Sequence, residues 1–265
     1  MSTSTKDLLG DLLAGIVSGG IEVVDLAQPL NENTPVMQLP EPFVNTGTFR
    51  YNRLSNYDEN GPAWYWNDFT TGEHVGTHFD APRHWISGKG QDGVDTLPMK
   101  NMIGEACVID VKQKCQENPD FLLTVADILE FESVHGKIPE HAYLILHTGW
   151  AEYNDNHEKF FNVGADGMPH TPGFAPEASE FLAKERKILG VGVETVGTDA
   201  GIAATLEPAF PSHYYMHEAN RYGMASLANV DKLPPRGAII IATPLKITDG
   251  SGSPIRPIAL VPRAK

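Results

Sequence analysis

Short apolar runs alternate with helix-like patterns along this chain of 265 residues. Most of the apolar runs are rich in Val and Ile and bounded by Gly, Pro or Asp, a pattern typical of buried β-strands. The predicted strands are Ile21–Leu26, Ala106–Val111, Tyr143–His147, Leu189–Val193 and Ala238–Ala242. Strands that alternate with helices indicate an α/β domain.

Two internal segments carry clear helix signals. Thr124 followed by Asp127 resembles a capping box, with Asp in place of the usual Glu, and predicts that a helix begins there. Residues 176–187 have Pro at the first turn and basic residues at the last, which matches helix polarity. Residues 61–80 and 238–260 have strand and loop patterns without helices, so the expected sheet is mixed, with flanking helices.

The N-terminal segment also has helical periodicity. Apolar residues from Leu8 to Val17 recur at positions three and four apart, which predicts an amphipathic helix over about residues 5–18. Asp7 and Asp11 interrupt the apolar run, and a secretory signal tolerates acidic residues badly. We therefore expect this segment to belong to the folded protein. No apolar stretch reaches the length of a transmembrane span.

Composition and charge narrow the class of protein. With 34 acidic and 20 basic residues, the formal net charge is −14. Such a chain repels phosphate backbones, and no run of Lys or Arg forms a basic patch, so nucleic-acid binding is not expected. Its two cysteines, Cys107 and Cys115, stand outside any zinc-finger or disulfide-framework spacing. This cysteine usage fits a reducing cytoplasm.

The segment Gly72–His84 concentrates the candidate chemistry. If residues 71–80 are extended, side chains alternate between faces, so His74, His78 and Asp80 point the same way. Gly76, on the same face, leaves room between them. Two imidazoles and a carboxylate form a suitable ligand set for a divalent cation such as manganese or zinc. The sequence therefore predicts a metal site.

His84 has a different expected role from these three ligands. Pro82 breaks the predicted strand, so the chain turns and His84 can return toward the metal site from another angle. A neutral imidazole near the working pH can take up and release protons. We therefore predict that His84 is the acid/base group of a hydrolase. Glu73 has the opposite strand parity and is not expected to be a ligand.

The run His-Val-Gly-Thr-His-Phe-Asp-Ala-Pro-Arg-His, residues 74–84, resembles the signature of the metal-dependent cyclase family. That family includes kynurenine formamidases and isatin hydrolases. The likeness extends over nearly the whole chain and is greatest for the isatin hydrolase branch. Segments that carry it are Asn33–Pro35, Gln38–Pro40, Ala225–Asn229 and Gly252–Arg256. It implies one swivelling β/β/α domain over residues 1–265, assembled as a homodimer or larger.

The resemblance also implies the number of metal ions and the substrate. Formamidases of the family complete a two-metal site with a histidine and, twelve positions later, a glutamate. His213 matches that histidine, but position 213 + 12 = 225 is Ala225, which cannot bind metal. The departure implies one ion per site, manganese as in the isatin hydrolase branch, with zinc as the alternative. His213 is then expected to hold the substrate or the developing oxyanion, while His217 is expected to be structural.

The expected reaction is hydrolysis of a small cyclic amide, isatin to isatinate, by a metal-activated water. Further substrate contacts are expected from Trp66, which precedes the metal motif in an aromatic cluster, and from Ser226. The alternatives are hydrolysis of another small amide or a lactone, such as N-formylkynurenine, and a metal-binding protein without turnover. A protein that only binds metal needs no free imidazole beside its ligands, so His84 discriminates between these classes.

Overall fold

The computed structural model of the protein describes residues 5–39 and 41–263. Its strands are β1 (Ile21–Asp25), β2 (Arg50–Asn56), β3 (Tyr65–Thr70), β4 (His78–Asp80), β5 (Ile103–Asp110), β6 (Leu122–Leu123), β7 (Tyr143–His147), β8 (Gly173–Phe174), β9 (Gly190–Val193), β10 (Tyr222–Ala225), β11 (Ala238–Ile241), β12 (Gly252–Pro254) and β13 (Ile258–Pro262). The main sheet has the strand order β1-β13-β11-β5-β7-β9-β10-β4-β12. Strands β5, β7, β9 and β10 are parallel, and the strands on both sides of them are antiparallel. The expected mixed sheet is confirmed.

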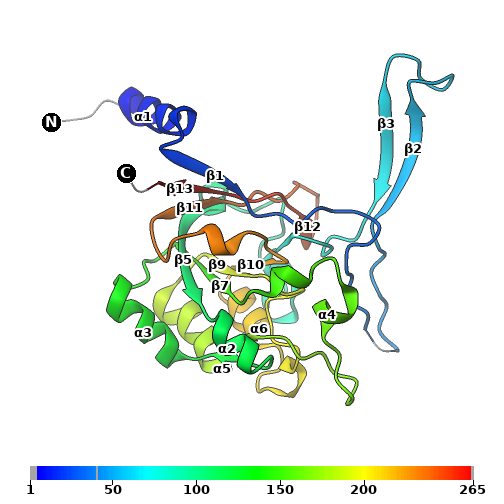
Figure 1. The fold of residues 1–265 in the computed structure, drawn as a ribbon. Helices are drawn as coiled ribbons and strands as arrows, with labels where there is room; N and C mark the ends of the chain where they lie inside the picture. Colours follow the sequence, from blue (N-terminus) through cyan, green and yellow to red (C-terminus); the bar gives the residue numbers. More distant parts are fainter. Residues whose placement is uncertain (1–4, 40, 264–265) are drawn as a thin grey trace.

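The α-helices of the described chain are α1 (Thr5–Ser18), α2 (Lys112–Glu117), α3 (Val125–His135), α4 (His157–Phe161), α5 (Pro176–Glu180) and α6 (Pro211–Glu218). Four of them cover one face of the sheet. Figure 1 shows α2, α3, α5 and α6 together below the sheet, whereas α1 lies apart beside β1. In the described part of the chain, no helix has both the length and the apolar character needed to cross a bilayer.

The alternation of side chains along β5 divides the core in two. Ala106 and Val108 belong to an apolar cluster with residues of β1, β11 and β13, enclosed by the curl of the sheet. Cys107 and Ile109 face the opposite way, into a cluster with α3 and α5. Because side chains alternate between the two faces of a strand, β5 contributes residues to both clusters. Both faces of the central strands are therefore buried, as their continuous apolar sequences indicate.

The predicted elements are present, with one change of helix type. Thr124 and Asp127 form the capping box at the start of α3, and α1 covers the predicted residues 5–18. The helix predicted at 176–187 begins at Pro176 as expected, but its second half, Phe181–Arg186, is a π-helix. Sequence periodicity does not resolve this difference, because six residues are too few for π spacing to be distinguished from α spacing.

The segment that precedes β4 differs from the prediction. Only His78–Asp80 forms a strand, whereas residues 73–77 form turns and bends. Gly76 has φ +66°, a left-handed conformation that glycine adopts without the strain a Cβ atom brings. The expectation of an extended chain from residue 71 to 80 is therefore wrong. His74 reaches the site by a tight turn in the chain and not by strand parity.

The β2–β3 hairpin, here called the arm (residues 50–70), projects from the body of the molecule (Figure 1). Its two strands pair with each other and not with the main sheet. Seven large apolar or aromatic side chains of the arm are between about one third and two thirds exposed: Tyr51, Leu54, Tyr57, Trp64, Tyr65, Trp66 and Phe69. Most natural monomers do not leave so much apolar surface in water.

Candidate metal and catalytic site

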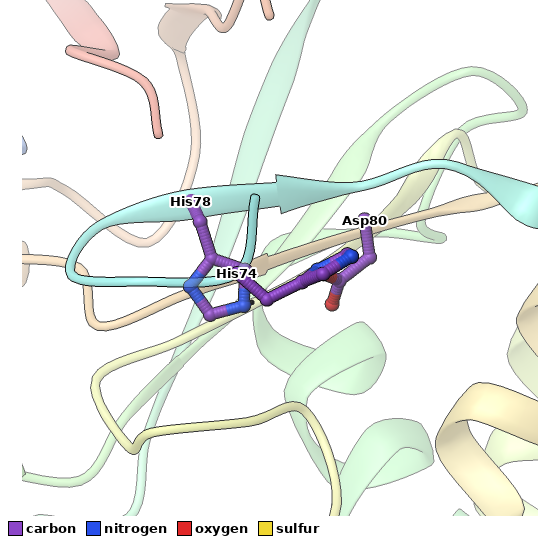
Figure 2. Close-up of side chains that lie close together, drawn as sticks. All are labelled: His74, His78 and Asp80. Carbon is purple, nitrogen blue, oxygen red and sulfur yellow. Dashed lines mark hydrogen bonds and ion pairs between the residues drawn. The ribbon is translucent and has the colours of Figure 1, made fainter. Parts of the chain in front are cut away.

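His74, His78 and Asp80 converge on one point in the structure (Figure 2). One ligand atom from each lies within 4.8 Å of those of the other two. Asp80 Oδ1 is 2.6 Å from His74 Nδ1 and 3.3 Å from His78 Nε2. The group predicted from the sequence is thus assembled, although only His78 and Asp80 share a strand face.

The hydrogen bonds around these residues orient one nitrogen of each histidine toward the shared point. His78 Nδ1 lies 2.7 Å from the Gly76 carbonyl oxygen, to which it donates, so Nε2 is the nitrogen that faces Asp80. His74 Nε2 lies 2.9 Å from Ser251 Oγ, which itself donates to Glu73, so Nδ1 is the nitrogen that faces Asp80. Both nitrogens hydrogen-bond the Asp80 carboxylate in this structure, and a bound divalent cation would take the place of those protons.

Asp80 gives further support to a cation at this point. The carboxylate is almost fully buried, and its Oδ2 has no hydrogen-bond partner among the described residues. Burial alone raises the pKa of Asp80, but His78 and His74 hold it well below the usual range. Burial lowers the pKa of His78, yet the Asp80 charge outweighs it and the net shift is upward. A buried carboxylate with an unused oxygen fits a metal ligand.

Two glycines make room for this group on either side of β4. Asp80 pairs with Gly223 of β10 and with Gly252 of β12. A Cβ atom at Gly223 would lie 2.9 Å from Asp80 Oδ2, and one at Gly252 would lie 2.4 Å from His74 Cε1. Larger residues on the neighbouring strands would push into the ligands.

Ala225 pairs directly with His78 and is completely buried in the apolar core. The position at which the formamidases were expected to have glutamate therefore lies beside the metal group in space. It offers only a methyl group there. The side chain at this position thus has no atom that can bind a metal ion, which agrees with the absence of the formamidase glutamate from the sequence.

His84 lies against the metal group, as predicted. It ends the short 3₁₀ turn Pro82–His84, and its ring stacks on that of His74 at a centroid distance of 3.8 Å and an angle of 28°. Burial lowers the pKa of His84 to about 2. This direction is opposite to the titration near neutral pH expected from the sequence, because burial disfavours the charged ring. The ring of His84 is therefore neutral beside the metal group.

His213 approaches the same group from α6. Its Nδ1 lies 2.5 Å from Asp199 Oδ2, and its Nε2 lies 3.8 Å from Asp80 Oδ2. Burial lowers the pKa of His213, but the hydrogen bond and charge of Asp199, with the charge of Asp80, raise it on balance. The ring packs against Trp85 at 4.7 Å. His213 is thus an oriented imidazole whose outer nitrogen points toward the metal group.

His217 also borders the site, one helical turn beyond His213. Its Nδ1 lies 3.1 Å from the Arg221 carbonyl oxygen, while its buried Nε2 has no hydrogen-bond partner among the described residues. Its ring centroid is 5.5 Å from that of His213 and 6.1 Å from that of His84. Burial lowers the pKa of His217 to about 4, so it is a neutral part of the wall.

The two expected substrate contacts, Ser226 and Trp66, occupy different surroundings. Ser226 follows β10 directly and is buried; its carbonyl accepts a hydrogen bond from Thr77 Oγ1 at 2.6 Å. Trp66 is more than half exposed on the arm, where it pairs with Ser55 toward the outer end of the hairpin. Ser226 therefore lies next to the metal strand, whereas Trp66 is not brought to it within this chain.

Sequence reasoning missed two residues that hold the site together. Asp199 reads as ordinary turn chemistry after a strand, but it accepts hydrogen bonds from the backbone N–H groups of Ser212 and His213 and binds the His213 ring. Ser251 lies 177 positions from the histidine it contacts. Only the Gly-Thr-Asp run before Ala200 was a usable signal for Asp199, and the sequence offers none for Ser251.

Comparison with known proteins places this site in context. The family model "Cyclase" matches residues 24–200. The isatin hydrolase of Roseibium aggregatum is 46% identical over 264 residues, which cover 98% of this chain and 100% of that protein. The kynurenine formamidase of Erythrobacter litoralis is 27% identical over 239 residues, which cover 88% of this chain and 91% of that protein.

The fold is also similar to solved structures. The crystal structure of an isatin hydrolase bound to the product analogue thioisatinate matches with a TM-score of 0.96 and 45% identity. The match covers 98% of this chain and 100% of that chain. The curled mixed sheet with helices on one face is therefore the architecture of that enzyme as well.

Proposed function

The chain belongs to the cyclase family of metal-dependent hydrolases, and from this premise we propose that it hydrolyses isatin to isatinate. The observation that carries the proposal is the convergence of three possible metal-ligand atoms beside an imidazole, His84. Whole-chain likeness to isatin hydrolases supports the choice of substrate.

The residues fit one divalent cation, held by His74 Nδ1, His78 Nε2 and Asp80. A divalent cation bound there lowers the pKa of water and polarises a carbonyl group. We propose Mn²⁺, with Zn²⁺ as the alternative, because a mixed set of imidazole and carboxylate ligands accepts both. Ala225 supports a single ion, since its methyl group supplies no further ligand.

The protein's own side chains then handle the protons and the charge. Water attacks the amide carbonyl carbon of the five-membered ring, and the bond from that carbon to the ring nitrogen breaks. His84 accepts the proton from the water and returns it to the departing nitrogen. His213, held by Asp199, steadies the charge that develops on the carbonyl oxygen. Ser226, beside the metal strand, is proposed to contact the substrate.

The reaction is tested by comparing two substrates on manganese-loaded protein. We expect kcat/KM for isatin to exceed that for N-formylkynurenine by at least about 100-fold, a difference of roughly 2.7 kcal/mol in transition-state binding. Loss of the colour of ring-closed isatin measures the first reaction, and release of formate measures the second. Equal or reversed preference would assign the protein to the formamidase branch of the family.

We propose that the protein acts as a homodimer or larger assembly in a reducing cytoplasm. Two free, buried cysteines support the compartment. The exposed arm supports the assembly, because a two-stranded hairpin is at best marginally stable without a packing partner. The apolar side of α1, with Leu9 and Val17 mostly exposed, adds a second uncovered surface. A second copy of the chain is the proposed occupant, which would also bring Trp66 close to another subunit.

Size-exclusion chromatography with light scattering tests this assembly. We expect the wild type to elute as a dimer or larger at about 10 μM, and the double variant Trp64→Ser/Trp66→Ser to shift toward the monomer, since buried aromatics dominate such interfaces. Val134→Ser is the control, because Val134 is apolar and more exposed than either tryptophan but lies on α3. A monomeric wild type would contradict the proposal.

A further inference from the structure

The chain at the start of β12 contacts the ring of His74 on the edge that faces away from Asp80. Ser251 Oγ is 2.9 Å from His74 Nε2, on the opposite side of the ring from Asp80. Gly252 leaves the space that the ring occupies, since a Cβ atom there would lie 2.4 Å from His74 Cε1. This loop is separated from His74 by most of the chain, yet it contacts two edges of the ring.

Glu73 fixes the direction of the hydrogen bond between Ser251 and His74. Its Oε2 accepts a hydrogen bond from Ser251 Oγ at 2.5 Å and another from the Ser251 backbone N–H at 3.1 Å. A carboxylate accepts only, so the serine hydroxyl hydrogen points at Glu73. The hydroxyl oxygen is then the acceptor for His74 Nε2–H. The chain of hydrogen bonds therefore has one direction: His74 Nε2–H donates to Ser251 Oγ, and the Ser251 hydroxyl donates to Glu73.

This direction determines which nitrogen of His74 is free. An imidazole whose Nε2 has the hydrogen presents a lone pair at Nδ1, and Nδ1 is the atom that faces Asp80 and His78. Glu73 is half-buried and forms no ion pair within the described chain. The hydrogen bonds that its carboxylate accepts come from Ser251. We propose that Glu73 and Ser251 are positioning residues for the metal ligand His74, holding its tautomer and ring orientation.

The inference rests on the proposed metal site but not on the identity of the substrate. Groups that hydrogen-bond the outer nitrogen of a ligand histidine typically contribute about 10–100-fold to metal affinity. Ser251→Ala removes the acceptor for His74 Nε2, and Glu73→Ala removes the group that directs the hydroxyl. We expect each variant to bind Mn²⁺ about 10–100-fold more weakly. Glu73→Gln keeps an acceptor oxygen without the charge and is expected to lose less.

The experiment titrates metal-stripped protein with MnCl₂ and measures free Mn²⁺ by electron paramagnetic resonance. Thermal unfolding of the same metal-free samples shows whether a variant has simply lost stability. Ser253→Ala is the matched control: Ser253 lies two residues along, is fully buried, and bonds the Leu245 N–H instead of His74. We expect it to lower the Tm and leave the Mn²⁺ affinity within about twofold.

The outcomes separate this inference from the proposed function. Weakened Mn²⁺ binding in Ser251→Ala and Glu73→Ala, with metal-free Tm values no lower than that of Ser253→Ala, supports the positioning role. Unchanged affinity in both variants, beside a wild type that binds Mn²⁺, overturns it and leaves the metal site intact. A wild type that binds no Mn²⁺ overturns both proposals.

Discussion

Replacing His78 by alanine is expected to abolish both metal binding and isatin hydrolysis. His78 Nε2 is one of the three converging atoms, so its loss leaves two ligands for the cation. The fall in metal affinity should exceed the roughly 10–100-fold that loss of an outer hydrogen-bond partner costs. Elemental analysis of the purified variant measures the metal, and the isatin assay measures activity.

Two further variants make this result specific. His78→Asn keeps a side-chain N–H for the Gly76 carbonyl but lacks Nε2, so it is expected to fold and still lose the metal. His170→Ala removes a histidine that is also paired with carboxylates, Asp120 and Asp166, and should keep both metal and activity. Full metal occupancy in His78→Asn would show that the cation binds elsewhere.

Replacing His84 is expected to separate catalysis from metal binding. When the ring nitrogen of His84 is removed, the attacking water loses its proton acceptor. Such general acid–base catalysis contributes ~10²–10⁴-fold to the rate. His84 also stacks on His74, so alanine removes a packing contact as well as the nitrogen. His84→Phe keeps a ring on His74 without any proton-accepting atom. We expect both variants to keep the metal and to lose about 10²–10⁴-fold in kcat.

Paired measurements of metal content and kcat decide the role of His84. If both variants are metal-free, His84 is a ligand and the acid/base assignment is wrong. If His84→Phe keeps the metal and near-normal kcat, the proton moves by another group. His213 is then the first to examine, because its Nε2 already lies 3.8 Å from Asp80.

The sequence by itself determined the elements whose signals are local. Short apolar runs predicted β5, β7 and β9, because a strand buried on both faces needs apolar residues at consecutive positions. Thr124 and Asp127 predicted the start of α3, since capping depends on residues three apart. The sequence also predicted His74, His78 and Asp80 as metal ligands, because the affinity of imidazole and carboxylate groups for metal ions does not depend on the backbone path between them.

Tertiary structure decided how those ligands meet and what holds them. The turn at Gly76 replaces the predicted strand, and it aims the Nδ1 of His74 at Asp80 through a left-handed backbone that periodicity does not reveal. Ser251 and Asp199 join the site from 177 and 14 positions away from the histidines they hold. Contacts at such separations depend on strand order in the sheet, here β10-β4-β12, and no local pattern specifies that order.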